Sequence, residues 1–183
     1  MLWPFNHFRK SPKSPRGTIQ AIYGMIVAHA REPLFYKHLD VPDTVDGRLD
    51  LLILQLWLVL RRLRTVPGGA KLSQALFDHF CSDMDANLRE MGVGDLAVPK
   101  RMQKFGEAFY GRTAAYDLAW SESETRLAQA LQKNILNGTH PESARLLAAH
   151  AARVAATLEA CDDATLLRAA WRFPVPLEQD LTT

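Results

Sequence analysis

Apolar side chains recur every three or four residues over most of the chain, which is the spacing of one face of an α-helix. The first such segment begins at Thr18, the expected N-cap, and ends at Pro33. Pro33 opens a short second helix that reaches Leu39, and the turn at 41–44 is expected to cap the helix after it. The sequence shows no strand-like alternation of apolar and polar residues, and it therefore predicts an all-α fold.

The most apolar segment is expected to form one long helix over about 44–64. Its apolar residues form one stripe, and a second set that includes Trp57 covers much of the opposite side, so this helix should be central in the fold. The longest apolar run, Leu51–Leu60, is roughly half of the ~20 residues that a membrane span needs. A buried helix is therefore expected here.

The rest of the chain is expected to be helical as well, with short interruptions. Gly111 permits a bend, and Thr139 and Glu142 fit a capping box, in which the hydroxyl and the carboxylate satisfy free amides at a helix start. Asp163 is the expected cap of the last helix. The further helices are predicted at 72–91, 99–110, 112–136 with a break at 121–123, 140–160 and 163–172.

Composition supports a folded globule rather than a disordered chain. Of the 183 residues 48% are apolar and 23% are charged, which leaves enough apolar surface for a core. We expect a single compact domain of seven or eight helices at 17–173, packed around the helix at 44–64, between an N-terminal arm at 1–16 and a C-terminal tail at 174–183. The net charge of +2 excludes a polycation, so any nucleic-acid role must rest on local charge.

The N-terminal arm combines aromatic and basic residues. Trp3, Phe5 and Phe8 lie beside Arg9 and Lys10, and this pairing of interfacial aromatics with cations is typical of a segment that binds an anionic membrane surface. The alternative is a solvated tail interrupted by prolines. On the first interpretation the protein would lie peripherally on the inner membrane.

Motifs of catalysis or cofactor binding are absent from the sequence. His79 and Asp83 stand one helical turn apart and are candidates to share a metal or a proton, but no second cluster supplies a third ligand, and the alternative is a polar row on a helix. Cys81 and Cys161 are expected to be small core residues. Two cysteines that are distant in sequence indicate a reducing, cytoplasmic compartment. We therefore expect no metal, cofactor or small-molecule substrate. A small helical enzyme, with His79 and Asp83 as its candidate residues, stays an alternative.

Charge is segregated along the chain. A basic block at 61–71 precedes an acidic block at 78–95, and the two are candidates to pair with each other. A second basic block is interleaved with aromatic residues, and the two sets are Lys100, Arg101 and Lys104, and Phe105, Phe109 and Tyr110. Such a pattern suits contact with RNA or the ribosome, or with an acidic protein surface. The alternative places the aromatics in the core and the cations in solvent.

Three stretches, at 41–64, 76–100 and 109–116, resemble the signature of the ubiquinol-cytochrome c chaperone family. The Asp-Met-Asp at 83–85 and the Phe-Tyr-Gly-Arg at 109–112 are the most specific parts, and the likeness extends over most of the chain. Where the family's long third helix is expected to carry a histidine, this sequence has Gln-Leu-Trp from Gln55, which argues against a role for an imidazole there.

The resemblance implies an assembly factor for respiratory complex III, the cytochrome bc complex. Members of this family attend newly made cytochrome b, work with a small partner protein and associate with the ribosome exit region. The family is not enzymatic. Because no convincing presequence precedes the domain, we expect a compact bacterial member.

We expect the partner to bind a groove formed by the two specific motifs, with methionine and aromatic side chains as adaptable apolar contacts and charges that set orientation. Alternatively Asp83 and Asp85 are internal and pair with Arg61, Arg62 or Arg112. The candidate partner-binding residues are Asp83, Met84, Asp85, Arg89, Lys100, Arg101, Lys104, Phe109, Tyr110, Gly111 and Arg112.

Overall fold

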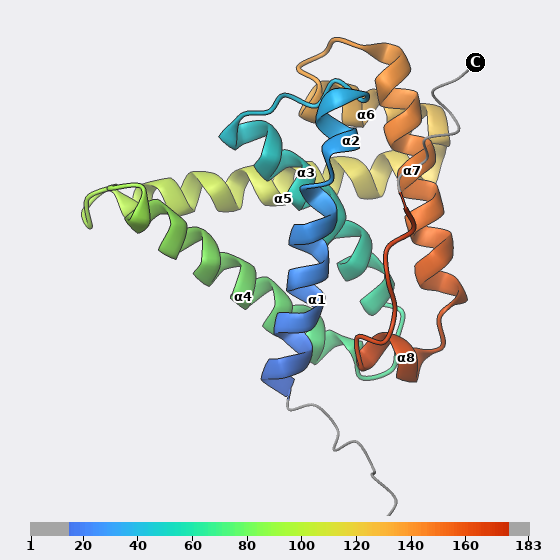
Figure 1. Cartoon of the computed structure of the whole chain (residues 1–183), viewed down its shortest axis with the longest axis horizontal. Coiled ribbons are helices and arrows are strands. Elements are labelled where there is room, and N and C mark those ends of the chain that lie inside the picture. The colour runs from blue at the N-terminus through green and yellow to red at the C-terminus, as the bar shows by residue number, and fades with distance from the viewer. Residues whose placement is uncertain (1–14, 176–183) are drawn as a thin grey trace, which may run out of the picture.

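The computed structural model describes residues 15–175 and shows eight helices joined by turns and loops, with no strand in that range (Figure 1). The predicted all-α class is confirmed. The helices are α1 (Pro15–Ala30), α2 (Pro33–Lys37), α3 (Val45–Leu63), α4 (Gly69–Glu90), α5 (Val98–Glu122), α6 (Glu124–Ile135), α7 (Pro141–Ala160) and α8 (Asp163–Leu167).

Helix α3 lies at the centre, as its apolar pattern predicts. It packs against α1, α4, α5, α6 and α7. Almost its whole length from Asp50 to Val59 is buried, with Trp57 among the largest fully enclosed side chains. Within the described part of the chain no helix combines the length and apolar character that crossing a bilayer requires.

Helices α4 and α5 form an arm that extends from this bundle (Figure 1). They meet at a tip made by the turn at 91–97, and α5 then crosses the bundle to reach α6. The last helical pair, α6 and α7, packs closely and closes the far side of α3. The arm therefore leaves one side of the bundle open between α4, α5 and the helices α1 and α3.

Two predicted helix boundaries are confirmed by their caps. The Thr44 hydroxyl accepts a hydrogen bond from the Gly47 amide at 3.1 Å, so the turn at 41–44 does start α3. The predicted break at 121–123 falls at Ser123, whose hydroxyl accepts from the Arg126 amide at 3.2 Å and starts α6.

Other boundaries were predicted wrongly. Helix α1 begins at Pro15, so Thr18 lies inside it, and α5 continues as a helix through Gly111. The capping box is not formed, because the Thr139 hydroxyl donates to the Leu136 carbonyl and His140, with φ 52°, takes the N-cap place without a side-chain cap. A bulky residue in this left-handed conformation was not apparent from local pattern.

The C-terminal segment also departs from prediction. Asp162, not Asp163, caps α8 by accepting from the Thr165 amide at 2.7 Å. Helix α8 ends at Leu167, and residues 168–175 do not continue it as a helix to Arg172 but run back beside α1. We call this extended segment the C-terminal strap.

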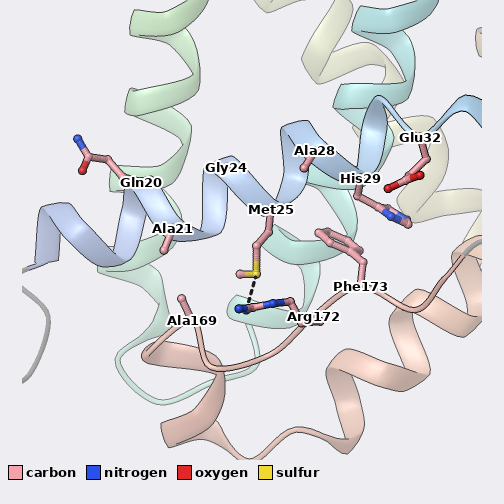
Figure 2. A pocket seen from close by; sticks show the side chains of 10 residues that line it. All are labelled: Gln20, Ala21, Gly24, Met25, Ala28, His29, Glu32, Ala169, Arg172 and Phe173. Atoms are coloured by element: carbon pink, nitrogen blue, oxygen red, sulfur yellow. Dashed lines mark hydrogen bonds between the residues drawn. The ribbon is translucent and has the colours of Figure 1, made fainter. Parts of the chain in front are cut away.

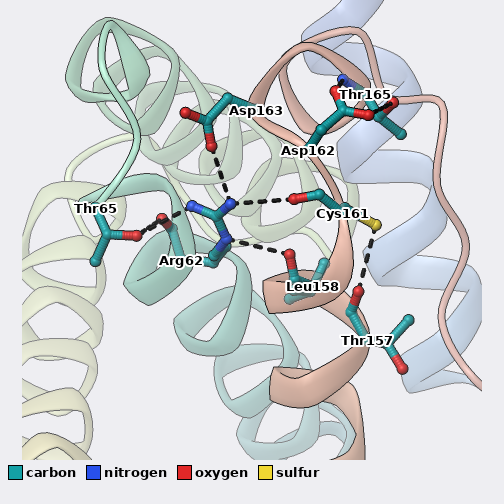
Figure 3. Close-up of polar contacts among 8 residues, drawn as sticks. All are labelled: Arg62, Thr65, Thr157, Leu158, Cys161, Asp162, Asp163 and Thr165. Atoms are coloured by element: carbon teal, nitrogen blue, oxygen red, sulfur yellow. Dashed lines mark hydrogen bonds and ion pairs between the residues drawn. The ribbon is translucent and has the colours of Figure 1, made fainter.

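Arg62 joins the end of α3 to the end of α7 (Figure 3). Its guanidinium donates to the carbonyls of Leu158 and Cys161 at 3.1 and 3.2 Å and to Asp163 at 3.0 Å. The carbonyls at a helix end otherwise lack partners, and a cation suits the negative end of the helix dipole. This side chain therefore fixes the C-terminal third of the fold to the central helix.

The basic block around α3 does not pair with the acidic block of α4, contrary to the sequence-based hypothesis. Each arginine of the block has a partner elsewhere: Arg61 pairs with Glu159, Arg62 with Asp163, and Arg64 with Asp117. The acidic side chains of α4 likewise have other partners, among them Tyr23 for Asp83 and Arg89 for Asp85.

Replacing Gly47 by alanine is expected to lower the free energy of unfolding by about 2 kcal/mol, because a Cβ there would overlap the Pro42 carbonyl oxygen in the turn before α3. Urea unfolding measures the change. Gly24→Ala is the control, since a Cβ at Gly24 meets no neighbour and helix propensity alone favours alanine by about 1 kcal/mol. Equal effects of the two substitutions would contradict the prediction.

Candidate protein-binding groove

A groove with a volume of about 510 Å³ opens between the α4–α5 arm and the helices α1, α2 and α3. We call it the methionine groove, because Met84, Met91 and Met102 line it from the arm side. Its apolar lining is completed by residues of several helices, among them Val27, Leu49, Leu52, Leu88 and Phe105.

The methionines give this groove an adaptable surface. Met84 and Met102 are half-buried and Met91 is 62% exposed, so their thioether chains are accessible to a ligand. Methionine side chains are flexible and polarizable, and they adjust to apolar partners of differing shape. The opposite wall is stiffer, since Leu49 and Leu52 stand on the central helix.

Charged groups stand at the edge of the methionine groove. Arg31, Arg101 and Lys104 line it, and no described residue forms an ion pair with any of the three. Asp46 and Asp83 supply the opposite charge. The groove is therefore apolar along its length with a mixed, mainly basic edge.

Asp83 is held in place by α1 rather than by a cation. Its carboxylate accepts from the Tyr23 hydroxyl at 2.7 Å and from the Asn87 amide at 3.2 Å. Burial, and next the Asp83 carboxylate, raise the pKa of Tyr23, so this tyrosine remains a hydrogen-bond donor. The contact ties α1 to α4 at the base of the groove.

The proposed internal pairs of Asp83 and Asp85 with Arg61, Arg62 or Arg112 are not formed. Asp85 pairs with Arg89 one turn along α4 at 2.7 Å, and Arg89 also reaches Asp95. Arg112 instead pairs with Asp50 of α3 at 2.7 Å, inside the bundle. Arg112 therefore joins α5 to α3, and its partner-binding role stays a prediction.

The structure places the predicted binding residues on different surfaces. Asp83, Met84, Arg101 and Lys104 line the methionine groove. Lys100 is exposed at the start of α5, and Asp85 and Arg89 form their surface ion pair outside the groove lining. The partner-binding role of these residues stays a prediction.

The second motif does not share this groove. Phe109 and Tyr110 line a separate groove of about 530 Å³, which we call the tyrosine groove, between α3, α4 and α5. Phe109 is buried there, Tyr110 is 63% exposed, and Gly111 is exposed on α5. The single groove expected from the two motifs is thus wrong.

Two of the three aromatic residues beside the second basic block are packed inside. Phe105 and Phe109 contact Phe80, with ring centroids 5.0 and 5.8 Å apart, as the alternative interpretation expects, whereas Tyr110 is exposed. Lys100, Arg101 and Lys104 are exposed. A role in RNA or ribosome binding stays a prediction that would rest on these cations and on Tyr110.

His79 and Asp83 belong to an aromatic and polar row rather than to a ligand cluster. Tyr23 lies between them, edge-on to the His79 ring at 4.8 Å and bonded to Asp83. Within residues 15–175 no group of three or more histidine, cysteine or acidic side chains is placed to bind a metal ion.

A third groove, of about 510 Å³, follows α1 on the side covered by the C-terminal strap (Figure 2). Arg172 contacts the Met25 sulfur at 3.4 Å, and the Phe173 ring stacks on His29 at 4.3 Å. His29 in turn lies 3.0 Å from His150 of α7, nitrogen to nitrogen. This pair was not predictable from the sequence, because 121 residues separate the two histidines and neither belongs to a motif.

The candidate membrane residues Trp3, Phe5, Phe8, Arg9 and Lys10 lie outside the described residues, as does most of the predicted C-terminal tail. Their role stays a prediction.

The sequence profile of the family described as Ubiquinol-cytochrome C chaperone matches residues 37–173. The chain belongs to this chaperone family. The resemblance seen in the sequence motifs is thereby confirmed, and the match includes α3, α4 and α5, which supply most of the methionine groove.

Relatives of this chaperone family member carry related descriptions. The chain is 29% identical over 108 residues to Protein CBP3, mitochondrial, of Saccharomyces cerevisiae, which covers 57% of this chain and 32% of the yeast protein. It is 24% identical over 136 residues to ubiquinol-cytochrome-c reductase complex assembly factor 1 of Xenopus laevis, and this alignment covers 73% of this chain and 68% of the frog protein. The chain thus spans about a third of the yeast protein and two thirds of the frog protein.

A solved structure shows the same fold for a second family member. The crystal structure of the Cbp3 homolog from Brucella abortus is 35% identical and superposes with a TM-score of 0.80, over 91% of this chain and 94% of that one. The arrangement of the arm and the central helix in this ubiquinol-cytochrome c chaperone is therefore a shared architecture.

Proposed function

We propose that this chaperone family member assists the assembly of ubiquinol-cytochrome c reductase, respiratory complex III, by holding a newly made subunit, cytochrome b, in the methionine groove. Family membership and the description of the frog relative support a role in assembly. A small partner protein is a further expectation of the family resemblance.

The observation that carries the proposal is the apolar, methionine-lined groove with a charged edge. A subunit that is not yet assembled exposes apolar surface that later becomes buried, and a chaperone must cover this surface reversibly. An amphipathic or apolar helix fits such a groove through side chains spaced one turn apart, while charges at the edge fix its direction. Holding a client in this way makes and breaks no covalent bond.

The candidate residues divide naturally under this proposal. Met84 and Met102 would contact the client's apolar face, and Arg101, Lys104 and Asp83 would orient it. Flexible methionine surfaces bind several related sequences with moderate affinity, which suits a chaperone that must release its client.

Replacing Met102 by glutamate is expected to reduce capture of cytochrome b by at least about tenfold, because a buried charge would face the client's apolar surface and loss of one central contact commonly has this effect. The measurement is affinity capture of the full chain from membranes solubilised in mild detergent. The matched control is Leu118→Glu, which changes a 61% exposed leucine on α5 that does not line the groove.

Two results decide the proposal. Cytochrome b should be enriched by the parent and by the Leu118→Glu variant, and lost with Met102→Glu at an unchanged melting temperature. The client's identity is tested by repeating the capture from a strain that cannot make cytochrome b. If cytochrome b is the client, no other complex III subunit should be captured through the methionine groove in that strain. Equal capture by the two variants would rule out the groove as the binding site.

A further inference from the structure

The tip of the α4–α5 arm displays apolar side chains at its apex. Leu96 is fully exposed and Met91 is 62% exposed. Both stand on the turn at 91–97, which lies at the far end of the arm from the helical bundle (Figure 1). The end of the arm therefore carries two exposed large apolar side chains within six residues.

Hydrogen bonds hold this tip in a defined conformation. The Val93 amide donates to the Leu88 carbonyl at 3.0 Å, and Gly92, with φ 79°, takes the left-handed place that ends α4. On the other side of the turn the Ala97 amide donates to the Gly94 carbonyl at 2.7 Å. The exposure of Leu96 is therefore built into the turn.

Cations surround the apex, and most are unpaired. Lys100, Arg101 and Lys104 are exposed in the first two turns of α5, and the structure shows no ion pair for them with any described residue. Arg89 pairs with both nearby carboxylates, Asp85 at 2.7 Å and Asp95 at 2.5 Å. From 85 to 104 the chain holds four cations and three carboxylates, and the basic character of the tip region rests on the three cations of α5.

We infer that this tip docks on an anionic lipid bilayer, with Leu96 and Met91 inserted at the boundary of headgroups and acyl chains and with Lys100, Arg101 and Lys104 on the headgroups. The apex combines exposed apolar side chains with cations that form no ion pair with a described residue, and this combination is typical of an element that lies at an anionic membrane interface. Along the axis of α5, Lys100 and Arg101 lie within roughly 8 Å of Leu96, which is inside the ~5–10 Å depth of interfacial protein elements, and Lys104 lies about 12 Å away, at the headgroups.

Lipid docking through the tip does not depend on the proposed chaperone function, since it requires no client. Lipid docking would nevertheless affect where the methionine groove lies. Met91 and Arg101 belong both to the tip region and to the lining of the methionine groove, so a docked arm holds one end of that groove at the membrane surface. A membrane-embedded client would reach the groove there.

The test uses the purified full chain and flotation with two kinds of vesicle, phosphatidylcholine alone and phosphatidylcholine with an equal part of phosphatidylglycerol. The parent is expected to bind the anionic vesicles only, and less strongly as salt is raised. Leu96→Ser should lower the partition coefficient about tenfold, and joint replacement of Lys100, Arg101 and Lys104 by glutamine about a hundredfold. Leu118→Ser, an equally apolar surface change outside the tip, is the control and should bind as the parent does.

Amide hydrogen exchange in the presence of vesicles separates the tip from the N-terminal arm, which carries its own aromatic and basic residues. Vesicle-dependent protection over 91–97 supports the inference. Unchanged exchange at 91–97 in the bound protein, or equal binding by Leu96→Ser and Leu118→Ser, would overturn it. Client capture is measured without vesicles, so a failure of the groove proposal and a failure of lipid docking give different results.

Discussion

Lowering the pH from 7 to 5 is expected to remove about 4 kcal/mol of the free energy of unfolding through two buried histidines, His29 and His150. The two rings are 6% and 2% exposed, and their Nε2 atoms lie 3.0 Å apart. Phe35 and Phe173 enclose them with aromatic contacts, so the pair lies in an apolar setting between α1, α7 and the C-terminal strap.

The hydrogen bond between these rings requires defined protonation. Arg153 Nη2 lies 3.4 Å from His150 Nδ1, and a guanidinium only donates, so His150 carries its proton on Nε2 and donates to His29. His29 must then present an unprotonated Nε2. Protonation of either accepting nitrogen would break one of these contacts.

Burial sets the direction of the pH effect. Desolvation lowers the pKa of His29 to about 4, and desolvation together with the charge of a protonated His29 and Arg153 lowers the pKa of His150 to about 3. The unfolded histidines take up protons near pH 6.5. Between about pH 4 and 6.5 the unfolded state therefore binds more protons, so the stability contributed by the neutral pair is lost as the pH falls through this window.

Urea unfolding at pH 7 and pH 5 measures this effect. In His150→Gln, where the amide keeps a hydrogen-bonding group near the former Nε2, the fall in unfolding free energy between the two pH values should be smaller than in the parent by about 2 kcal/mol. His38→Gln removes an exposed histidine and is the control for loss of an imidazole as such. The same pH dependence in parent and His150→Gln would show that the pair is not the cause.

The helices were predictable from sequence because their signals are local. The long apolar segment around Trp57 and the caps at Thr44 and Ser123 depend on residues within a turn or two of each other, and the structure confirms them. The predicted capping box at 139–142 was wrong, because the chain enters α7 through His140 in the left-handed conformation, which the pattern of capping residues does not signal.

The groove was only partly predictable, because its walls come from segments that are distant in sequence. The arm side was anticipated at Asp83 and Met84, and Arg101 and Lys104 were recognised as a basic block. The wall from α1 and α3 was not, since a half-buried leucine such as Leu52 looks like any other core residue of an apolar helix. The predicted ion-pair partners were wrong for a related reason: opposite charge in the sequence does not specify the distance between two side chains or their burial.

The Asp50–Arg112 pair illustrates this dependence on tertiary packing. Its side chains are only 11% and 25% exposed, and its atoms approach to 2.7 Å between α3 and α5. Burial raises the pKa of Asp50 to about 6, and the Arg112 charge lowers it only in part. A carboxyl whose folded pKa is raised stabilises the fold while it is protonated, below about pH 4, and this contribution is lost as the pH rises through 6.

Replacing Arg112 by methionine is expected to lower the free energy of unfolding by about 3 kcal/mol at pH 7, because it leaves the Asp50 carboxylate buried without its cation. At pH 5 the loss should be only about 1 kcal/mol, since Asp50 is then largely protonated in the folded state. Urea unfolding of the single and double variants at both pH values measures this difference.

The double variant Asp50→Asn with Arg112→Met separates an uncompensated charge from lost packing. It removes both charges, so it should recover at least half of the stability that Arg112→Met loses at pH 7 and show no extra loss between pH 5 and pH 7 at this site. A loss from Arg112→Met that is equal at both pH values, and that Asp50→Asn does not relieve, would mean that Arg112 stabilises the fold through the packing of its aliphatic chain. The pair would then hold α5 against α3 by shape, and its charges would contribute nothing to the position of the arm.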